Sequence, residues 1–283
     1  MKFVSHLGWI AACCTALLMA GCAGGPNNVR NASNPNGPAV PAGATAGGRG
    51  DIVTESDEPD NRRRARLRLE LASGYFGAGQ TNVALDELKQ SLAADPNFGE
   101  AYNLRGLVYL RLNDIPLAEE SFRRSLALNP RDADAAHNYG WMLCQQSRFA
   151  ESFQMFGQAI GNPTYAGQAK SLMAQGICQQ RAGQPALAEQ SLVRAYELDA
   201  GNPVTAYNLA NLLYLKGDYT RAQFYIRRLN SGDLANAETL WLGSKIEQRL
   251  GNREATRQFG EQLKLRYPTS REASAYERGM FNE

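Results

Sequence analysis

The sequence predicts an all-helical protein in which about six similar helical hairpins stack into a right-handed superhelix, followed by a short C-terminal helix. A pattern of small and apolar residues recurs about every 34 residues between Ala65 and Ser270. The same region is rich in Ala, Leu, Gln, Glu and Arg and poor in β-branched residues, a composition that favours helix. Hairpins of this kind bury their apolar faces only against neighbours, so tandem copies predict one continuous stack.

The overall composition is that of an ordinary globular protein. The chain has 283 residues, of which 43% are apolar and 20% are charged. The formal net charge is +2, from 30 basic and 28 acidic residues. A balance this even provides no field of one sign to attract phosphates, so we expect no nucleic-acid partner.

The first 21 residues have the layout of a secretory signal peptide. Lys2 supplies a basic start, and the apolar run from Leu7 to Met19 is too short to span a bilayer as a helix. The stretch Leu18-Met19-Ala20-Gly21-Cys22 resembles a bacterial lipobox, with Met in place of the usual Leu. We therefore predict lipidation at Cys22; the alternative is an ordinary signal peptide with an incidental Cys.

The segment 22–64 is predicted to be a disordered tether after the lipidated Cys22. It is rich in Gly, Pro, Asn and Ala and has no apolar periodicity, so it cannot bury enough surface to fold. Ala23 would be the second residue of the mature lipoprotein. In lipoprotein sorting this residue favours the outer membrane, so we expect a lipid-anchored protein on its periplasmic face.

The helical repeats can be aligned from two prolines. Pro96 and Pro130 each follow an apolar helical run and are taken as position 32 of a 34-residue repeat, the length of a tetratricopeptide (TPR) unit. The predicted repeats are 65–98, 99–132, 133–168, 169–202, 203–236 and 237–270. Residues 271–283 are predicted to be a capping tail whose helix frays at its end.

Small residues recur where two helices must approach closely. Position 8 of the successive repeats holds Ala72, Gly106, Gly140, Gly176, Ala210 and Ser244. Position 24 carries a large apolar side chain in the early repeats, but in repeat six it is Gly260. Repeat six is therefore the most divergent, as is common for a terminal repeat.

Positions 2, 5, 9 and 12 of each first helix are free of this packing and are expected to face a concave groove. Contiguous exposed apolar side chains there would mark an interaction site for an amphipathic peptide or helix. The alternative is that superhelical curvature buries part of the set as ordinary core. The candidate partner-binding residues are Leu69, Phe76, Leu107, Leu110, Trp141, Tyr207 and Tyr214.

We predict no catalytic residue, no metal site, no cofactor and no small-molecule substrate. His137 is the only histidine after the signal peptide, and no cluster of His or Cys accompanies it at the spacing of a zinc site. The chain has no nucleophile-elbow motif and no phosphate-binding loop. A hydrolase that uses the groove as a cleft, with His137 or a groove serine, is the rival hypothesis.

Cys144 and Cys178 remain after lipidation of Cys22. They lie 34 residues apart, on the first helices of neighbouring repeats. The periplasm is oxidising, so a disulfide that links repeats three and four is one expectation. Two buried thiols that pack as small apolar side chains are the other.

The segment from His137 to Phe149 and the connection from Pro163 to Ala166 resemble the type IV pilus biogenesis/stability lipoproteins, the PilF/PilW family. This family shares the lipobox and the six-repeat length, and differs here by the long tether. The resemblance implies a pilotin, an outer-membrane lipoprotein that promotes localisation and multimerisation of the pilus secretin in pilus (fimbrial) biogenesis. The resemblance also implies that the early repeats contact the secretin, at Leu69, Phe76, Leu107 and Leu110. The alternative is another envelope scaffold lipoprotein, which serves outer-membrane protein or peptidoglycan assembly.

Overall fold

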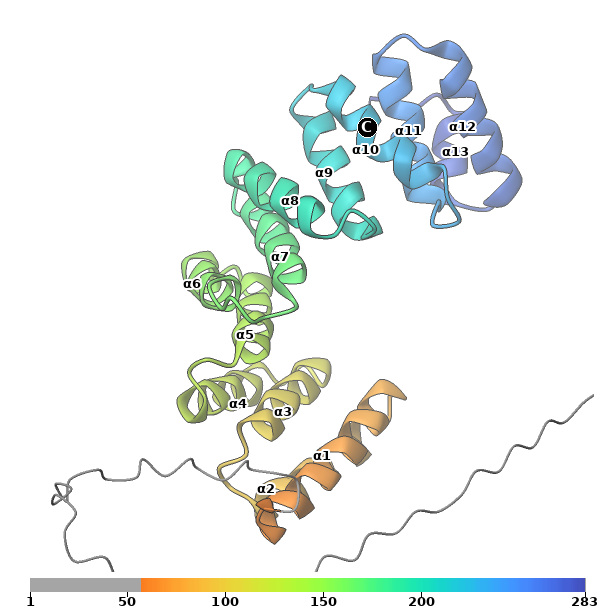
Figure 1. Ribbon diagram of the computed structural model, residues 1–283. Helices are drawn as coiled ribbons and strands as arrows, with labels where there is room; N and C mark the ends of the chain where they lie inside the picture. The colour runs from red at the N-terminus through yellow and green to blue at the C-terminus, as the bar shows by residue number, and fades with distance from the viewer. Residues whose placement is uncertain (1–56, 283) are drawn as a thin grey trace, which may run out of the picture. The chain divides into compact units, whose positions relative to one another are not determined.

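The computed structural model describes residues 57–282, and this part of the chain contains thirteen α-helices and no β-strand (Figure 1). The predicted all-helical superhelix of tandem hairpins is confirmed. The signal peptide, Cys22 and the tether up to residue 56 lie outside the described residues. None of the described helices is long and apolar enough to cross a membrane. The helices are α1 (Asp60–Gly77), α2 (Thr81–Ala94), α3 (Gly99–Arg111), α4 (Ile115–Leu128), α5 (Ala133–Gln145), α6 (Phe149–Ile160), α7 (Gln168–Arg181), α8 (Pro185–Leu198), α9 (Pro203–Leu215), α10 (Tyr219–Asn230), α11 (Ala237–Arg249), α12 (Arg253–Arg266) and α13 (Arg271–Glu277).

Each hairpin pairs an odd-numbered helix with the even-numbered helix that follows it. We call α1, α3, α5, α7, α9 and α11 the A helices and their partners the B helices. Each A helix also contacts the A helix of the next hairpin, and α11 contacts α13 in the same way. The A helices therefore form a continuous row, whose exposed surface we call the A-helix face.

Most A helices begin where the repeat pattern places a repeat start. Helices α3, α5, α9 and α11 begin at Gly99, Ala133, Pro203 and Ala237. Helix α7 begins at Gln168, one residue before the expected start.

Helix α1 begins five residues before the expected start, so the prediction of a disordered tether was wrong for residues 60–64. The guanidinium of Arg62 pairs with the carboxylate of Asp95 at 2.5 Å and lies 4.6 Å from the ring centroid of Phe98. Both partners are in the loop between α2 and α3. These contacts hold the first turn of α1, although its sequence is polar.

In the second and fourth hairpins, a glycine at position 8 meets a large apolar side chain of the partner helix. A Cβ atom added to Gly106 in α3 would lie 2.6 Å from the ring of Phe122 in α4. A Cβ atom added to Gly176 in α7 would lie 2.7 Å from the Leu192 side chain in α8. Glycine at these positions lets the paired helices approach to a distance that any side chain would prevent.

Buried serines link the two helices of the first two hairpins. Ser91 donates its hydroxyl hydrogen bond to the carbonyl of Ala65 at 2.7 Å, and Ser125 donates to that of Gly99 at 2.9 Å. Both serines are fully buried. The hydroxyls give each of these A helices a buried polar contact with its B helix at position 1 of the repeat, which explains the serine at position 27.

The turn inside every hairpin needs a left-handed backbone conformation at position 15. The angle φ is positive at Gly79, Gly183, Gly217 and Gly251, and also at Asn113 and Ser147. Glycine adopts this conformation without steric cost and Asn tolerates it, whereas a serine is strained there. Ser147, with φ of 59°, therefore carries backbone strain in the third hairpin.

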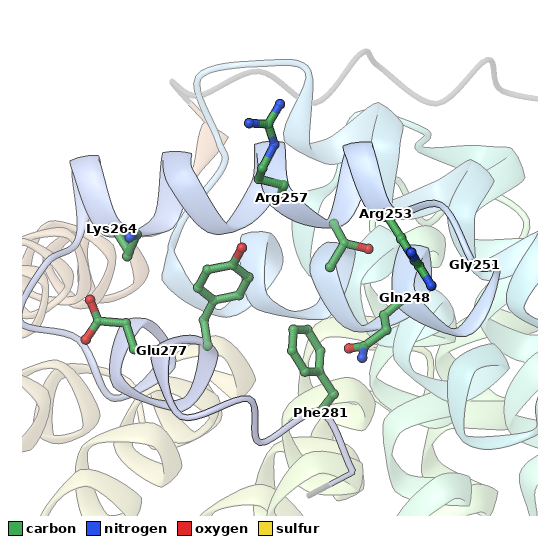
Figure 2. Close-up of a pocket in the computed structure, with 9 residues that line it drawn as sticks. Gln248, Gly251, Arg253, Arg257, Lys264, Glu277 and Phe281 are labelled. Atoms are coloured by element: carbon green, nitrogen blue, oxygen red, sulfur yellow. The ribbon is translucent and has the colours of Figure 1, made fainter.

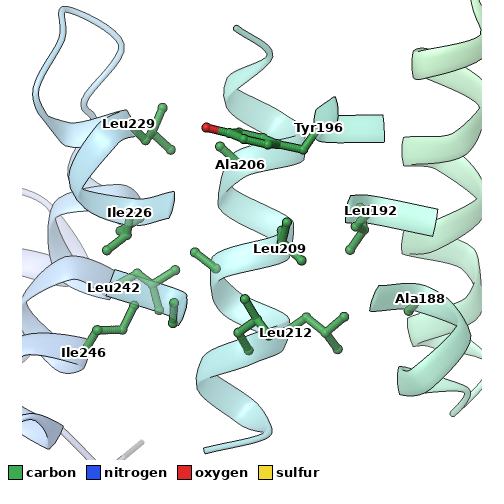
Figure 3. Close-up of a cluster of buried hydrophobic side chains, with 13 residues drawn as sticks. Ala188, Leu192, Tyr196, Ala206, Leu209, Leu212, Ile226, Leu229, Leu242 and Ile246 are labelled. Carbon is green, nitrogen blue, oxygen red and sulfur yellow. The ribbon is translucent and has the colours of Figure 1, made fainter. Parts of the chain in front are cut away.

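The apolar core is a series of clusters that follow the stack. One cluster is made by α8, α9, α10 and α11, and Figure 3 shows its side chains meeting between neighbouring helices. Leu192, Leu209 and Ile226 are fully buried in it. Because a typical hairpin is stabilised through its neighbours, the clusters join the repeats into one unit.

The last hairpin closes in a different way. At Gly260, position 24 of repeat six, an added Cβ atom would collide with the ring of Tyr276 from α13. The aromatic ring of the capping helix thus occupies the space that a large side chain fills in the other repeats. Glycine at this position therefore leaves room for the ring of the capping helix.

We predict that Gly106→Ala destabilises the protein by about 1–3 kcal/mol, because the methyl group displaces the buried ring of Phe122. Gly74→Ala is the matched control, since it lies in α1 with no atom within 4 Å of the added Cβ. Alanine is the better helix former, so the control should be neutral or stabilising by up to about 1 kcal/mol. Urea unfolding of both variants measures the difference, and equal effects would contradict the close-packing explanation.

We also predict that Ser147→Gly stabilises the protein by up to about 1 kcal/mol, because glycine removes the cost of the left-handed conformation. The reverse change, Gly183→Ser, should destabilise it by a similar amount. Thermal unfolding compares the two variants. A loss of stability in Ser147→Gly would show that the serine is not strained.

Candidate partner-binding face

The seven candidate residues all lie on A helices, and each is half-buried. They come from positions 5, 9 and 12, as the repeat pattern places them. Each packs on one side against a buried cluster and keeps part of its surface exposed. The same side chains therefore support the core and also leave apolar surface on the A-helix face.

The first two repeats supply four of the seven. Leu69 and Phe76 of α1 pack against the cluster that contains Leu88, and Leu107 and Leu110 of α3 pack against the cluster that contains Phe122. The residues are apolar and lie on neighbouring A helices. This places aliphatic and aromatic surface side by side near the start of the stack.

Arg111 of α3 covers the ring of Phe76 in α1. Its guanidinium carbon lies 3.9 Å from the ring centroid, and its Nη1 donates to the backbone carbonyl of Phe76 at 2.8 Å. The cation fixes the ring and adds a positive charge beside the apolar surface. A partner segment that binds here would contact both the apolar surface and the guanidinium of Arg111.

Repeat three departs from the expected pattern. Trp141 is half-buried as the other candidates are, but His137 and Cys144, at positions 5 and 12, are 5% and 1% exposed. The prediction that these two positions face an open groove was therefore wrong. Both side chains lie between α5 and α7 and join the hairpins.

The structure joins Cys144 and Cys178 in a disulfide, with their Cα atoms 5.9 Å apart. The bond connects α5 to α7 and so covalently links repeats three and four. Both sulfurs lie in the cluster that also contains Phe156 and Ala174, with Trp141 packed against it. Trp141 therefore packs against the part of the A-helix row that the disulfide links covalently.

His137 and Ser171 form the second link between α5 and α7. The Nδ1 of His137 lies 2.8 Å from the Oγ of Ser171, and both side chains are buried. Burial, aided by the charge of Lys170, lowers the pKa of His137 to about 4, although Asp134 acts in the opposite direction. A Ser–His contact of this kind is a component of hydrolase sites, but here no open surface reaches it.

The C-terminal half of the face is aromatic and partly basic. Tyr207 and Tyr214 of α9 pack against the cluster of repeats four to six. Burial raises the pKa of Tyr207, with Glu238 and Glu272 adding to the effect. The ammonium of Lys245 in α11 lies 5.3 Å from the ring centroid of Tyr214, and burial lowers the pKa of this lysine.

Aromatic residues of the capping tail also lie on this half of the face, and the sequence pattern did not indicate them. Tyr276 and Phe281 lie 6.4 Å and 5.0 Å from Trp241, measured between ring centroids. Met280 and Phe281 are half-buried, and the fraying of the tail's end stays a prediction. The only indication of these ring contacts in the sequence was the presence of two aromatic residues in a largely polar segment.

Two further surface features were not predicted from the sequence. Leu67 and Leu71, on the outer side of α1, are 50% and 49% exposed because no hairpin precedes them in the described part of the chain. At the opposite end, α11, α12 and the tail enclose a cleft of about 800 Å³ lined by Arg253, Arg257 and Phe281 among others (Figure 2). Among residues 57–282, no group of three or more His, Cys, Asp or Glu side chains is placed to hold a metal ion.

We predict that acid destabilises the fold partly through His137. Its pKa is lower in the folded state, at about 4, than the usual 6.5, so the unfolded chain binds the proton more tightly. The stability contributed by the neutral side chain is complete above pH 6.5 and is lost as the pH falls towards 4. Between pH 7 and 4.5 this loss amounts to roughly 2 kcal/mol.

The wild-type protein is compared with the variant His137→Gln, whose side chain keeps a hydrogen-bonding group but does not titrate. Urea midpoints measured from pH 7 to 4.5 should fall less steeply in the variant. Parallel pH profiles for the two proteins would refute the assignment to His137.

Comparison with known proteins agrees with this architecture. The tetratricopeptide-repeat family model matches residues 69–130 and 106–169. The type IV pilus assembly protein PilF of Pseudomonas aeruginosa is 28% identical over 233 residues, which cover 82% of this chain and 91% of PilF.

Two solved structures have the same arrangement of helices. PilW, a widely conserved type IV pilus biogenesis factor, superposes with a TM-score of 0.69 and 31% identity, over 75% of this chain and 97% of PilW. The Pseudomonas aeruginosa PilF structure superposes with a TM-score of 0.71 and 27% identity, over 78% of this chain and all of PilF. Near-complete coverage at this identity shows common descent across the whole stack. The chain belongs to the PilF/PilW family of tetratricopeptide-repeat proteins of type IV pilus biogenesis.

Proposed function

We propose that this protein is an outer-membrane pilotin, lipidated at Cys22, which binds a segment of the pilus secretin on its A-helix face. Membership of a pilus biogenesis family supports a scaffold role in pilus assembly. The pilotin role further specifies the secretin as the client and the outer membrane as the location. The acyl chains would anchor the protein on the periplasmic side of the outer membrane, and the bound secretin would thereby be brought to that membrane.

One observation carries the proposal: half-buried apolar and aromatic side chains recur on the A helices of all six repeats. Such side chains combine a fixed position, given by their packing, with apolar surface that remains open to a partner. An amphipathic helix or extended segment would cover this surface and remove it from water. The early repeats, with Leu107 and Leu110, provide the aliphatic part of the surface.

The second candidate is another envelope scaffold of the same architecture, whose client belongs to outer-membrane protein or peptidoglycan assembly. The same face would serve such a client. Identification of the bound protein separates the two candidates.

We predict that deletion of the gene abolishes the secretin multimer in outer-membrane extracts prepared without boiling. Full restoration should require the wild-type chain, and Cys22→Ala should restore it only in part because the anchor is lost. A multimer that persists after deletion would exclude the pilotin role. The A-helix face would then be used to capture a different envelope client.

The binding face is tested in the same strain with the double variant Leu107→Gln/Leu110→Gln. Loss of two apolar contacts should weaken secretin binding by about tenfold or more and reduce the multimer accordingly. Leu265→Gln is the control, because Leu265 is 83% exposed on α12, outside the A-helix row. Circular dichroism must show that both variants remain folded. Equal multimer levels in the double variant and the control would place the contact elsewhere.

A further inference from the structure

The chain's own C-terminal tail lies on the A-helix face of repeats five and six. After α13 the backbone turns at Gly279, where φ is 67°, and the amide of Met280 donates to the carbonyl of Ala275. The ring of Phe281 then packs 5.0 Å from Trp241 and 5.9 Å from Tyr276, measured between centroids.

Polar contacts hold the same segment. The hydroxyl of Tyr214 in α9 donates to the carbonyl of Phe281 at 3.5 Å, and the Nη2 of Arg249 in α11 donates to the Oδ1 of Asn282 at 3.1 Å. The tail is therefore bound through one aromatic side chain, one backbone carbonyl and one side-chain acceptor. This is the set of contacts by which a surface holds a short extended peptide.

The tail contacts the positions that carry the candidate partner-binding residues elsewhere in the stack. Trp241 and Lys245 stand at positions 5 and 9 of repeat six, and Tyr214 stands at position 12 of repeat five. We call Tyr214, Trp241, Lys245 and Arg249 the tail site. A partner that follows the A-helix face to its C-terminal end would meet this site already occupied.

The contact is small enough to exchange. Among the described residues, 278–282 extend beyond α13, and Met280 and Phe281 remain half-buried. Its occupancy depends on the covalent connection, which gives a tethered segment a millimolar effective concentration. A segment with comparable contacts and a longer interface would replace it.

The charge around the tail site defines the segment that fits. A cleft of about 330 Å³ beside the tail is lined by Trp241, Lys245, Arg271, Glu272, Ala275, Arg278 and Met280. Arg249 adds a further cation. This cleft and Arg249 together present four basic groups and one acidic group, so an acidic segment is favoured over a basic one.

We propose that the tail is an internal ligand of a peptide-binding site formed by Tyr214, Trp241, Lys245 and Arg249, and that a partner segment with an aromatic residue flanked by acidic residues replaces it. The inference rests on the proposed function only in that the A-helix face binds a protein segment. It does not require that segment to come from the secretin.

The test uses the full-length chain in detergent and a variant that ends at Arg278, which retains α13. The probe is the fluorescein-labelled peptide Gly-Met-Phe-Asn-Glu, which has the sequence of residues 279–283. Fluorescence anisotropy should show that the shortened chain binds the probe at least about tenfold more tightly than the full-length chain, whose site is filled. Trp241→Ala in the shortened chain, or replacement of Phe by Ala in the peptide, should abolish binding.

Equal binding to both chains would overturn the proposal, as would absence of binding to the shortened chain. The peptide Gly-Asp-Phe-Asp-Glu should bind more tightly than Gly-Lys-Phe-Lys-Lys, and the reverse order would refute the charge argument. Sedimentation should show a monomer. A dimer that Phe281→Ala dissolves would mean that the tail occupies a second copy instead. Because purified protein is used, these outcomes are independent of the secretin experiment.

Discussion

The structure depends on the close approach of two helices within each hairpin. Gly106 and Gly176 accept the large side chains of Phe122 and Leu192 into the space where their own side chains would be. Small residues at position 8 of the other repeats allow a similar approach of the A helix to its B helix, so the contact recurs about every 34 residues along the stack. The A helices are thereby aligned in a row, and side chains at positions 5, 9 and 12 become half-buried instead of fully exposed. The candidate binding surface is thus a product of the packing that stabilises the fold.

The two ends of the stack differ in how their outer apolar surfaces are covered. At the C-terminal end, Tyr276 of the capping helix fills the space above Gly260, and the tail beyond it covers Trp241. At α1, the outer leucines 67 and 71 stay about half exposed. The A-helix face is therefore mainly aliphatic near α1 and α3, where the ring of Phe76 lies beneath Arg111, and it is aromatic, basic and covered by the tail at α9 and α11. A segment bound along the face would meet these two environments in order.

The repeat period was sufficient to predict the fold class and the residues that lie on the A-helix face, because a helical repeat fixes the orientation of each position. It did not predict the first turn of α1, which is held by the contact of Arg62 with Asp95, a residue far along the chain. It also placed His137 on the open surface, whereas contact with Ser171 of the next repeat buries it. The packing of Phe281 lies outside the repeat altogether. Each of these features depends on contacts between repeats or with the tail, which a single-repeat pattern does not contain.

The central claim is that the A-helix face holds the secretin. Site-specific photocrosslinking in cells tests it most directly, with a photoreactive amino acid at Leu110 on the face and, as control, at Leu265 on α12. The account predicts a crosslink to the secretin from position 110 and none from position 265. A secretin crosslink from position 265 alone, or a crosslink from position 110 to a different envelope protein, would contradict it.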